Sequence, residues 1–276
     1  NLNDNFLDLK ATKNLFESII ENRNLRFLTH ILVNRSTINE QILTDFSHHI
    51  TNLANQNQNI LTYLDLGSIN KGSDLLFQSL ANNQVPLECL KIAGSFLDHE
   101  SIDHFNIFLC NAPFLKELDI SNTNLDMKEI GMVINSIQAN KKITIFTLHI
   151  SSMKLHGKRL LEFIKNFRDH SLNKWVGLNL EGNNIDSYDL QELNALFQSM
   201  INLSWLNLSC NFTPSMKYLD IELANLLKIP RLNYIGLRGN IKKNLKEKKI
   251  KDNDIKGKKK ISKQTMLSFI SSLNEL

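Results

Sequence analysis

The stretch from residue 98 to 104 comes closest, by residue type, to a metal-binding motif. It reads Asp-His-Glu-Ser-Ile-Asp-His, with His99 and His104 as its two imidazoles. A helical zinc motif needs two His at positions i and i+4, which share one helix face, but these two are five residues apart. His99 and Asp103 do share a face, yet two ligands do not close a zinc site. We therefore interpret this stretch as the polar face of a helix and expect no bound metal.

Nucleophilic and phosphate-binding chemistry also lacks its usual residues. Cys89, Cys110 and Cys210 have no Cys or His at the spacing of a catalytic or metal-binding pair. There is no Gly-rich phosphate loop, and no order of Ser, His and Asp that the chain would bring together. We expect neither enzymatic activity nor a cofactor. Because three cysteines without framework spacing favour a reducing compartment, we expect a cytoplasmic location.

A strand, a turn and a helix that recur eight times are the main signal in the chain. From Leu115 onward, Leu118 and Ile120 are two residues apart, as in a strand with one buried face, and four turn-forming residues follow. Ile130 and Val133 then begin a helical spacing. The copies start 26 to 33 residues apart, at Leu28, Leu61, Leu87, Leu115, Ile145, Trp175, Leu203 and Leu232.

Positions one, four and six of every copy are apolar, in a chain that is 42% hydrophobic, and are predicted to face a common core. The fourth position is Ile31, Leu64, Leu90, Leu118, Leu148, Leu178, Leu206 and Ile235. The sixth position is Val33, Leu66, Ile92, Ile120, Ile150, Leu180, Leu208 and Leu237. The ninth position is Asn only in the last three copies, at Asn183, Asn211 and Asn240.

This pattern, L-x-x-L-x-L-x-x-N from roughly residue 24 to 276, resembles that of leucine-rich repeat proteins. The period near 28 to 30 residues, with a full helix in each repeat, is similar to the ribonuclease-inhibitor subclass. The resemblance implies an α/β fold: a right-handed solenoid, or horseshoe, with a parallel sheet on the concave face and helices on the convex face. It also implies that the ninth-position Asn bonds to backbone groups of the turn.

Four segments are expected along the chain. Residues 1–23 are predicted to form an N-terminal helical cap, because a helical pattern there has no strand before it, and residues 24–240 to form about eight repeats. Residues 241–261 are predicted to be a Lys-rich flexible insertion, and residues 262–276 a C-terminal capping helix. The stretch 241–260 holds ten Lys against three acidic residues, a net charge of +7, whereas the whole chain carries +4. This segment could contact nucleic acid or an anionic membrane, but it has no aromatic residue to stack on bases, so we interpret it as a solvated loop.

Positions three, five and seven of each copy are predicted to lie on the concave face, where a partner would bind. Trp205 and Tyr234 fall on adjacent strands there, with Arg238 on the same surface, and these residue types dominate binding energy at interfaces. The alternative is that the capping helix or the Lys-rich segment covers the two aromatic residues. A second group on this face, the acidic patch of Asp65, Glu117 and Asp119, is expected to steer association. The remaining predicted partner-binding residues are Tyr63, His149 and Glu181.

We therefore expect a module that binds a protein partner through its concave face. The chain is similar to irregular, Asn- and Lys-rich repeat effectors that intracellular bacteria inject into host cells, which would place it in the host cytoplasm. One alternative is a regulator or inhibitor of an enzyme, as ribonuclease inhibitor and the Ran GTPase-activating protein are in the same subclass. The latter has an acidic tail, whereas this chain has a basic segment. The other alternative is the binding domain of a longer enzyme.

Limited digestion of the folded protein with trypsin should cut first between residues 242 and 260, because their lysines favour solvation over packing. Mass spectrometry of the first fragments, together with circular dichroism of the cleaved protein, measures this. First cuts at Lys141, Lys142 or Arg159 would contradict the assignment of the Lys-rich insertion.

Overall fold

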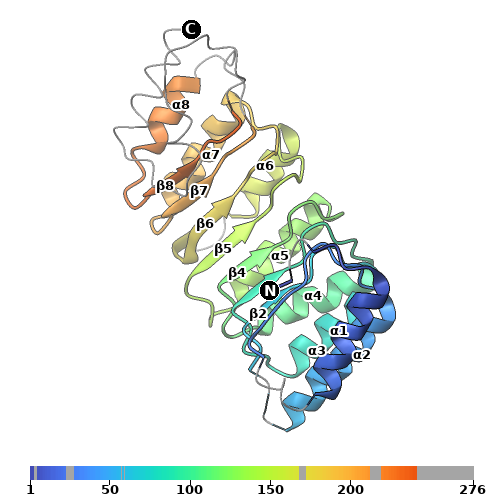
Figure 1. The fold of residues 1–276 in the computed structure, drawn as a ribbon. Coiled ribbons are helices and arrows are strands. Elements are labelled where there is room, and N and C mark those ends of the chain that lie inside the picture. The colour runs from blue at the N-terminus through green and yellow to red at the C-terminus, as the bar shows by residue number, and fades with distance from the viewer. Residues whose placement is uncertain are drawn as a thin grey trace. The chain divides into compact units, whose positions relative to one another are not determined.

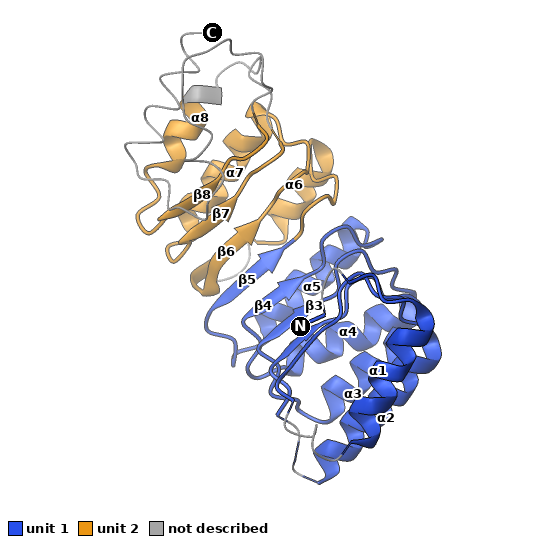
Figure 2. Ribbon diagram, viewed as in Figure 1, with its two compact units in different colours: residues 1–149 blue, residues 150–276 orange. Residues whose placement is uncertain are grey.

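The computed structural model describes residues 1–2, 5–22, 28–56, 58, 60–167, 172–211 and 219–240, with only the backbone described at 219 and 220. The predicted insertion at 241–261 and the predicted capping helix at 262–276 lie outside the described residues. Within the described part, strands alternate with helices, and eight parallel strands follow one another in sequence order (Figure 1). This confirms the predicted fold class, an α/β repeat architecture with a parallel sheet. The chain divides into two compact units, residues 1–149 and 150–276 (Figure 2).

The first unit holds five strands and five helices among its described residues. Its strands are β1 (His30–Leu32), β2 (Tyr63–Asp65), β3 (Cys89–Lys91), β4 (Glu117–Asp119) and β5 (Phe146–His149). Its helices are α1 (Leu9–Glu21), α2 (Glu40–Asn55), α3 (Ser73–Asn82), α4 (His99–Asn111) and α5 (Met127–Ala139). Each strand pairs in parallel with the next, and each helix from α1 to α5 packs against its neighbour.

The second unit repeats the same arrangement. Its described elements are α6 (Lys158–Lys165), the short 3₁₀ helix η2 (Leu172–Lys174), β6 (Trp175–Asn179), α7 (Ser187–Ser199), β7 (Trp205–Asn207), α8 (Leu219–Leu226) and β8 (Tyr234–Gly236). β6, β7 and β8 pair in parallel, and α7 packs between α6 and α8.

The repeat positions line up across the strands and form the core. Leu64 pairs in register with Leu90 and Leu90 with Leu118, and all three are 0% exposed. The sixth position is buried in the same way from Val33 to Leu208, while Leu237 in the last described repeat is half-buried. Because successive strand residues point to opposite faces, this buried column lies on the helix side of the sheet and leaves positions three and five on the other side.

Acidic and amide side chains set where the helices begin. Asp126 accepts a hydrogen bond from the backbone of Glu129 at 2.8 Å, and Glu129 in turn accepts one from the backbone of Asp126 at 2.7 Å, which completes a capping box at the start of α5. Asp186 and Asp189 form the same box at the start of α7. These caps hold each helix at a fixed point after its strand, so the strand-to-helix turn is repeated closely.

In the second unit the ninth-position asparagines form a buried ladder. The Asn211 Oδ1 accepts hydrogen bonds from the backbone N–H groups of Asn183 at 2.7 Å and of Ile185 at 3.2 Å, and its Nδ2 donates to the Leu180 and Leu208 carbonyls. Asn183 and Asn240 bond to their neighbouring turns in the same way. Each amide therefore satisfies backbone groups of two consecutive turns, which would otherwise be buried without partners.

Hydroxyl residues stand at three ninth positions of the first unit, Ser36, Ser95 and Thr123. The Ser95 Oγ accepts from the Ile69 N–H at 3.0 Å and donates to the Gly67 carbonyl at 2.8 Å. Ser95 thus links two successive turns as the asparagines do. It makes fewer hydrogen bonds, because a hydroxyl has one polar hydrogen and one oxygen, whereas an amide has two polar hydrogens and a separate oxygen.

One predicted core position is wrong. Ile145, the first position of the fifth repeat, is 48% exposed, whereas Ile143 and Phe146 are buried. β5 already begins at Phe146, with alternating burial at Phe146 and Leu148, so Ile145 points to the other side. The aromatic ring buries a larger apolar area than the isoleucine would, which favours this register.

The N-terminal helix is shorter than predicted. A helical cap was predicted over residues 1–23, but α1 begins at Leu9, where the Asp8 side chain accepts from the Ala11 N–H at 2.8 Å. Phe16 packs edge-on against Phe46 of α2 at 5.1 Å between ring centroids. The Leu2 N–H donates to the Leu32 carbonyl at 2.8 Å and so occupies a bonding group on the outer edge of β1. A capping role of this segment stays a prediction.

Leu118→Ala should lower the free energy of unfolding by about 2–5 kcal/mol, because the lost side chain leaves a cavity in the fully buried column. Ile145→Ala should lower it by less than about 0.5 kcal/mol, since that side chain is exposed. Urea denaturation of both variants measures the difference. Equal losses in the two variants would mean that the register of β5 is not the one described.

Candidate functional site

The strands present one face that the helices do not cover. In β4 and β7 the central Leu is buried and the residues on either side of it are half-buried, so positions three and five stand on the helix-free face. The residues predicted to bind a partner all come from this face or from the turns that follow it. They fall into two groups, one in each unit.

In the first unit, Lys91, Glu117 and His149 form a charged network on three neighbouring strands. The Lys91 Nζ lies 2.7 Å from the Glu117 Oε1, and the His149 Nε2 lies 3.3 Å from the same oxygen. The Lys91 ammonium also lies 5.5 Å from the centre of the Tyr63 ring, a cation–π distance. His30 on β1 extends this group beyond Tyr63, because the two rings stack with their centroids 5.5 Å apart. One row of side chains therefore runs across all five strands of the unit.

The network shifts the pKa values of Glu117 and Lys91 and of the neighbouring Cys89. Hydrogen bonding to His149, opposed by burial and aided by Lys91, lowers the pKa of Glu117 to about 2. Burial alone would lower the pKa of Lys91, but hydrogen bonding to Glu117 and Tyr63 outweighs it and raises that pKa. Burial, with the charge of Glu117, raises the pKa of the Cys89 thiol to about 12. Cys89 therefore stays a neutral thiol at physiological pH, which does not suit a nucleophile.

The three carboxylates of the predicted acidic patch differ in burial and in their bonding partners. Glu117 is paired as described above, and Asp65 is only 4% exposed. Asp119 is half-buried, and its carboxylate accepts a hydrogen bond from the Ser121 N–H at 2.9 Å. Asn179 and Asn207 make the equivalent bond in the second unit. The fifth-position side chain thus helps to shape the turn after the strand, whatever else it contacts.

In the second unit, Trp205 and Tyr234 stack on each other. They are in direct register on β7 and β8, their ring centroids are 5.6 Å apart and their planes differ by 10°. Both side chains are half-buried, and Arg238 in the turn after β8 is exposed. The Arg238 N–H donates to the Ser209 Oγ at 3.1 Å, which fixes the backbone of that turn.

Glu181 lies beside this pair in a hydrogen-bonded arrangement. Its Oε2 accepts from the Asn207 Nδ2 at 3.0 Å, and its Oε1 lies 3.8 Å from the Cys210 Sγ. Gly236 makes room for Asn207, because a Cβ at Gly236 would collide with the Asn207 amide. The second unit therefore offers two stacked rings with an acid, an amide and a guanidinium nearby.

The metal-like stretch has a structural role. Asp98 caps α4, with its side chain accepting from the Ser101 N–H at 2.9 Å, and the His99 side chain is fully exposed. Among the described residues, no group of three or more His, Cys, Asp or Glu side chains has the arrangement of a metal site. All three cysteines are unpaired thiols.

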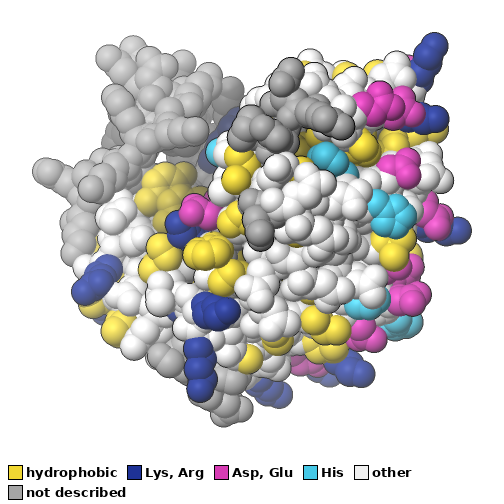
Figure 3. Space-filling view, turned by 90° about the horizontal axis from the view of Figure 1, so that it is seen from below, with side chains coloured by type: hydrophobic (Ala, Val, Ile, Leu, Met, Phe, Trp, Pro, Cys, Tyr) yellow, Lys and Arg dark blue, Asp and Glu magenta, His cyan; other side chains and the backbone are white. Residues whose placement is uncertain are grey.

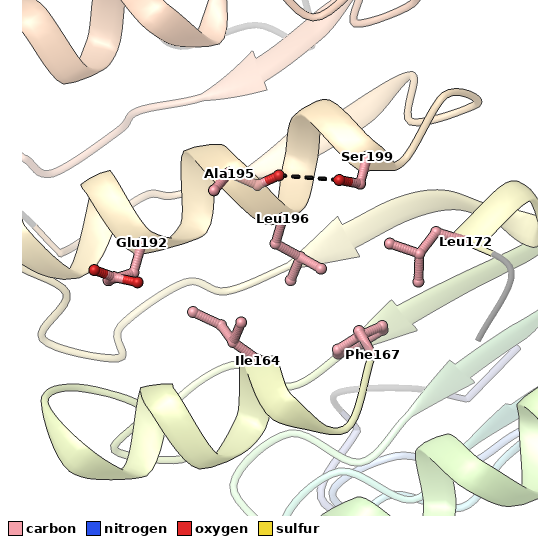
Figure 4. Close-up of a pocket in the computed structure, with 7 residues that line it drawn as sticks. All are labelled: Ile164, Phe167, Leu172, Glu192, Ala195, Leu196 and Ser199. Carbon is pink, nitrogen blue, oxygen red and sulfur yellow. Dashed lines mark hydrogen bonds between the residues drawn. The ribbon is translucent and has the colours of Figure 1, made fainter. Parts of the chain in front are cut away.

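Two surface depressions lie among the described residues. One, of about 400 Å³, lies between α6 and α7 and is lined mainly by apolar side chains such as Ile164 and Leu196 (Figure 4). Ser199 there donates to the Ala195 carbonyl of its own helix, and the Glu192 side chain also lines the depression. The other, of about 220 Å³, lies in the first unit beside Tyr63 and Glu117. On the face seen in Figure 3, exposed hydrophobic side chains form small separate groups, and acidic and His side chains gather along one side.

Lys91 and His30 were not among the predicted binding residues. Both were present in the columns of positions three and five, where Lys91 stands diagonally opposite Glu117 on the next strand. Opposite charges on neighbouring strands were the available signal.

Among the described residues, no helix combines the length and apolar character needed to cross a bilayer.

Comparison with known proteins identifies no family. No family model matches the chain, and no curated protein matches it. Among solved structures, the chain is similar to actin-binding site 2 of leiomodin-1, with 19% identity and a TM-score of 0.42 over 55% of this chain and 86% of that one. It is also similar to an internalin from Listeria monocytogenes, with 14% identity and a TM-score of 0.32 over 83% of this chain and 76% of that one.

Glu117→Gln should make the free energy of unfolding less dependent on pH between about 4.5 and 2. Because folding lowers the pKa of Glu117 from 4.5 to about 2, its charge stabilises the native state above pH 4.5, and this contribution disappears as the pH falls toward 2. The stability gap between wild type and variant should therefore be largest at pH 5 to 6 and close near pH 2. Urea midpoints across this range measure it. A gap that stays constant would show that the carboxylate makes no charge-dependent contact in the folded protein.

Proposed function

We propose that this chain is a non-catalytic module that binds a protein partner through the helix-free face of its sheet. The observation that carries the proposal is the stacked pair of Trp205 and Tyr234, two half-buried rings held in register on neighbouring strands. Trp, Tyr and Arg are the residue types that contribute most to binding energy at protein interfaces, and Arg238 lies on the next turn. Rings already stacked on each other lose little conformational freedom when a partner packs on them.

The polar side chains on the same face support binding rather than catalysis. Lys91 and His149 both contact one oxygen of Glu117, and the Cys89 thiol is held neutral by its high pKa. A nucleophile needs an adjacent base that lowers its pKa or removes its proton, and this arrangement does the opposite to Cys89. Charges fixed in this way suit the selection of a complementary surface.

We also propose a repeat subclass, a cellular location and a biological role for the module. Repeats of 26 to 33 residues with helices of up to 16 residues support a ribonuclease-inhibitor-like subclass, and three unpaired cysteines support the cytoplasm as its place of action. Its Asn- and Lys-rich repeats support a role as an effector in a host cell. We also propose the segment plan of an N-terminal cap at 1–23, repeats at 24–240, a Lys-rich insertion at 241–261 and a capping helix at 262–276.

Affinity capture followed by binding kinetics tests the proposal. Wild-type protein, Trp205→Ala, Tyr234→Ala and the control Tyr188→Ala would each be used as bait in lysates of the source and of a host cell. Trp205→Ala and Tyr234→Ala should each weaken binding of the captured partner by about 2 kcal/mol, or roughly thirtyfold in Kd. Tyr188, which is 65% exposed on α7, is a matched aromatic on the helix layer and its loss should leave binding unchanged.

Two outcomes would contradict the proposal. One is a partner that binds Trp205→Ala as tightly as wild type, which would put the interface elsewhere. The other is a Trp205→Ala variant that unfolds, because the side chain would then be part of the core and not a contact surface. Thermal melts of all four proteins separate these cases.

A further inference from the structure

The depression of about 220 Å³ in the first unit has a clear origin in the repeat register. Tyr63, Cys89 and Glu117 occupy position three on three consecutive strands and are directly paired. The middle residue is small and the outer two are large. Because neighbouring strands are about 4.8 Å apart, the two large side chains stand about 9.5 Å apart at their backbones, with a gap between them. Cys89 is therefore the floor of a slot, and Tyr63 and Glu117 are its walls.

Both walls are rigid. The Tyr63 ring is supported by the His30 ring that stacks on it and by the Lys91 ammonium at 5.5 Å. Glu117 is anchored through its Oε1, which contacts both Lys91 and His149. Both of these contacts use the same oxygen, and a carboxylate can accept about four hydrogen bonds in all. The second oxygen thus retains accepting capacity on a carboxylate whose position is already fixed.

The charge around the slot is negative. On positions three and five of β2 to β4, Asp65, Glu117 and Asp119 outweigh the single cation Lys91. At the rim, Glu88 and Lys116 pair at 2.9 Å and cancel each other. The raised pKa of Cys89, which comes from burial and then from the charge of Glu117, agrees with a negative surrounding. A cationic group is the complement of this slot.

The size and shape of the slot restrict the ligand further. Its volume is smaller than the roughly 300–1,000 Å³ of pockets that take drug-sized ligands, so one side chain fits it better than a cofactor. A guanidinium is flat, packs with its face on an aromatic ring and presents several N–H donors to carboxylates. An ammonium could donate to the carboxylate, but it has no flat face to lie on the neutral floor.

We propose that the slot formed by Tyr63, Cys89 and Glu117 receives an arginine side chain of the protein partner. The guanidinium lies above Cys89 beside the edge of the Tyr63 ring and donates to Glu117, with Glu88 at the rim. The inference rests on the proposed function only in that the arginine belongs to a partner. The slot and its chemistry are independent of Trp205 and Tyr234, which lie in the other unit.

Nuclear magnetic resonance of the full chain, labelled with ¹⁵N, tests the proposal without a known partner. The probes are N-acetyl-arginine amide and the neutral, nearly isosteric N-acetyl-citrulline amide. The arginine probe should shift the amide signals of Thr62, Tyr63, Cys89 and Glu117 along a saturating curve. The citrulline probe should bind at least fivefold more weakly, because it lacks the charge.

Three variants sharpen the test. Glu117→Gln should weaken arginine binding at least fivefold, since it removes the charge of the acceptor. Cys89→Leu should abolish binding by filling the floor, with no change of charge. Glu162→Gln, an exposed carboxyl on α6, should bind the probe as wild type does. If Glu117→Gln does not fold, the citrulline comparison and Cys89→Leu still decide the question.

The proposal is overturned if the arginine probe shifts no signals around the slot or shifts acidic surface residues indiscriminately. It is also overturned if citrulline binds equally, or if folded Cys89→Leu binds as wild type does. These results are distinct from a failure of the proposed function, which is measured with Trp205→Ala against a captured partner. An intact effect of Trp205→Ala without arginine binding would leave the interaction surface in place and remove only this contact.

Discussion

A single strand, turn and helix cannot bury its own apolar side, and this constraint organises the molecule. The Leu at the fourth position has a strand neighbour on each side and helices behind it, and only the stack supplies them all. The free energy of each repeat therefore depends on the next one, as in other repeat proteins. Parallel pairing in register also fixes which side chains meet, because residues at the same repeat position become neighbours on adjacent strands.

The same register that builds the core builds the helix-free face. Tyr63, Cys89 and Glu117 occupy position three in the first unit, and Trp205 and Tyr234 occupy the same position in the second unit. A small residue between two large ones makes a slot, and two aromatic residues side by side make a stack. The turns that carry these strands are held by buried amides and hydroxyls, of which Asn211 and Ser95 are examples. The surface is thus supported by backbone hydrogen bonds that do not involve its exposed atoms.

The repeat pattern was sufficient to predict the fold class and most of the core, because apolar periodicity decides which face is buried. It failed at Ile145, where Phe146 one residue later competes for the same space and shifts the start of β5. The columns also placed Trp205 beside Tyr234, since strand register follows from the repeat. Opposite charges on neighbouring strands indicated that Lys91 and Glu117 could pair. Their actual contact and the burial of Asp65 do not follow from spacing, because both depend on side-chain rotamers and neighbours.

Quenching of tryptophan fluorescence by acrylamide tests most directly whether a partner covers the helix-free face. The chain has two Trp, of which Trp175 is 1% exposed and Trp205 is half-buried. In the free protein we expect one quenchable and one protected component. Addition of the captured partner should protect the quenchable component and leave the other unchanged. Quenching that the bound partner does not alter would contradict the account, because the partner would then bind away from Trp205.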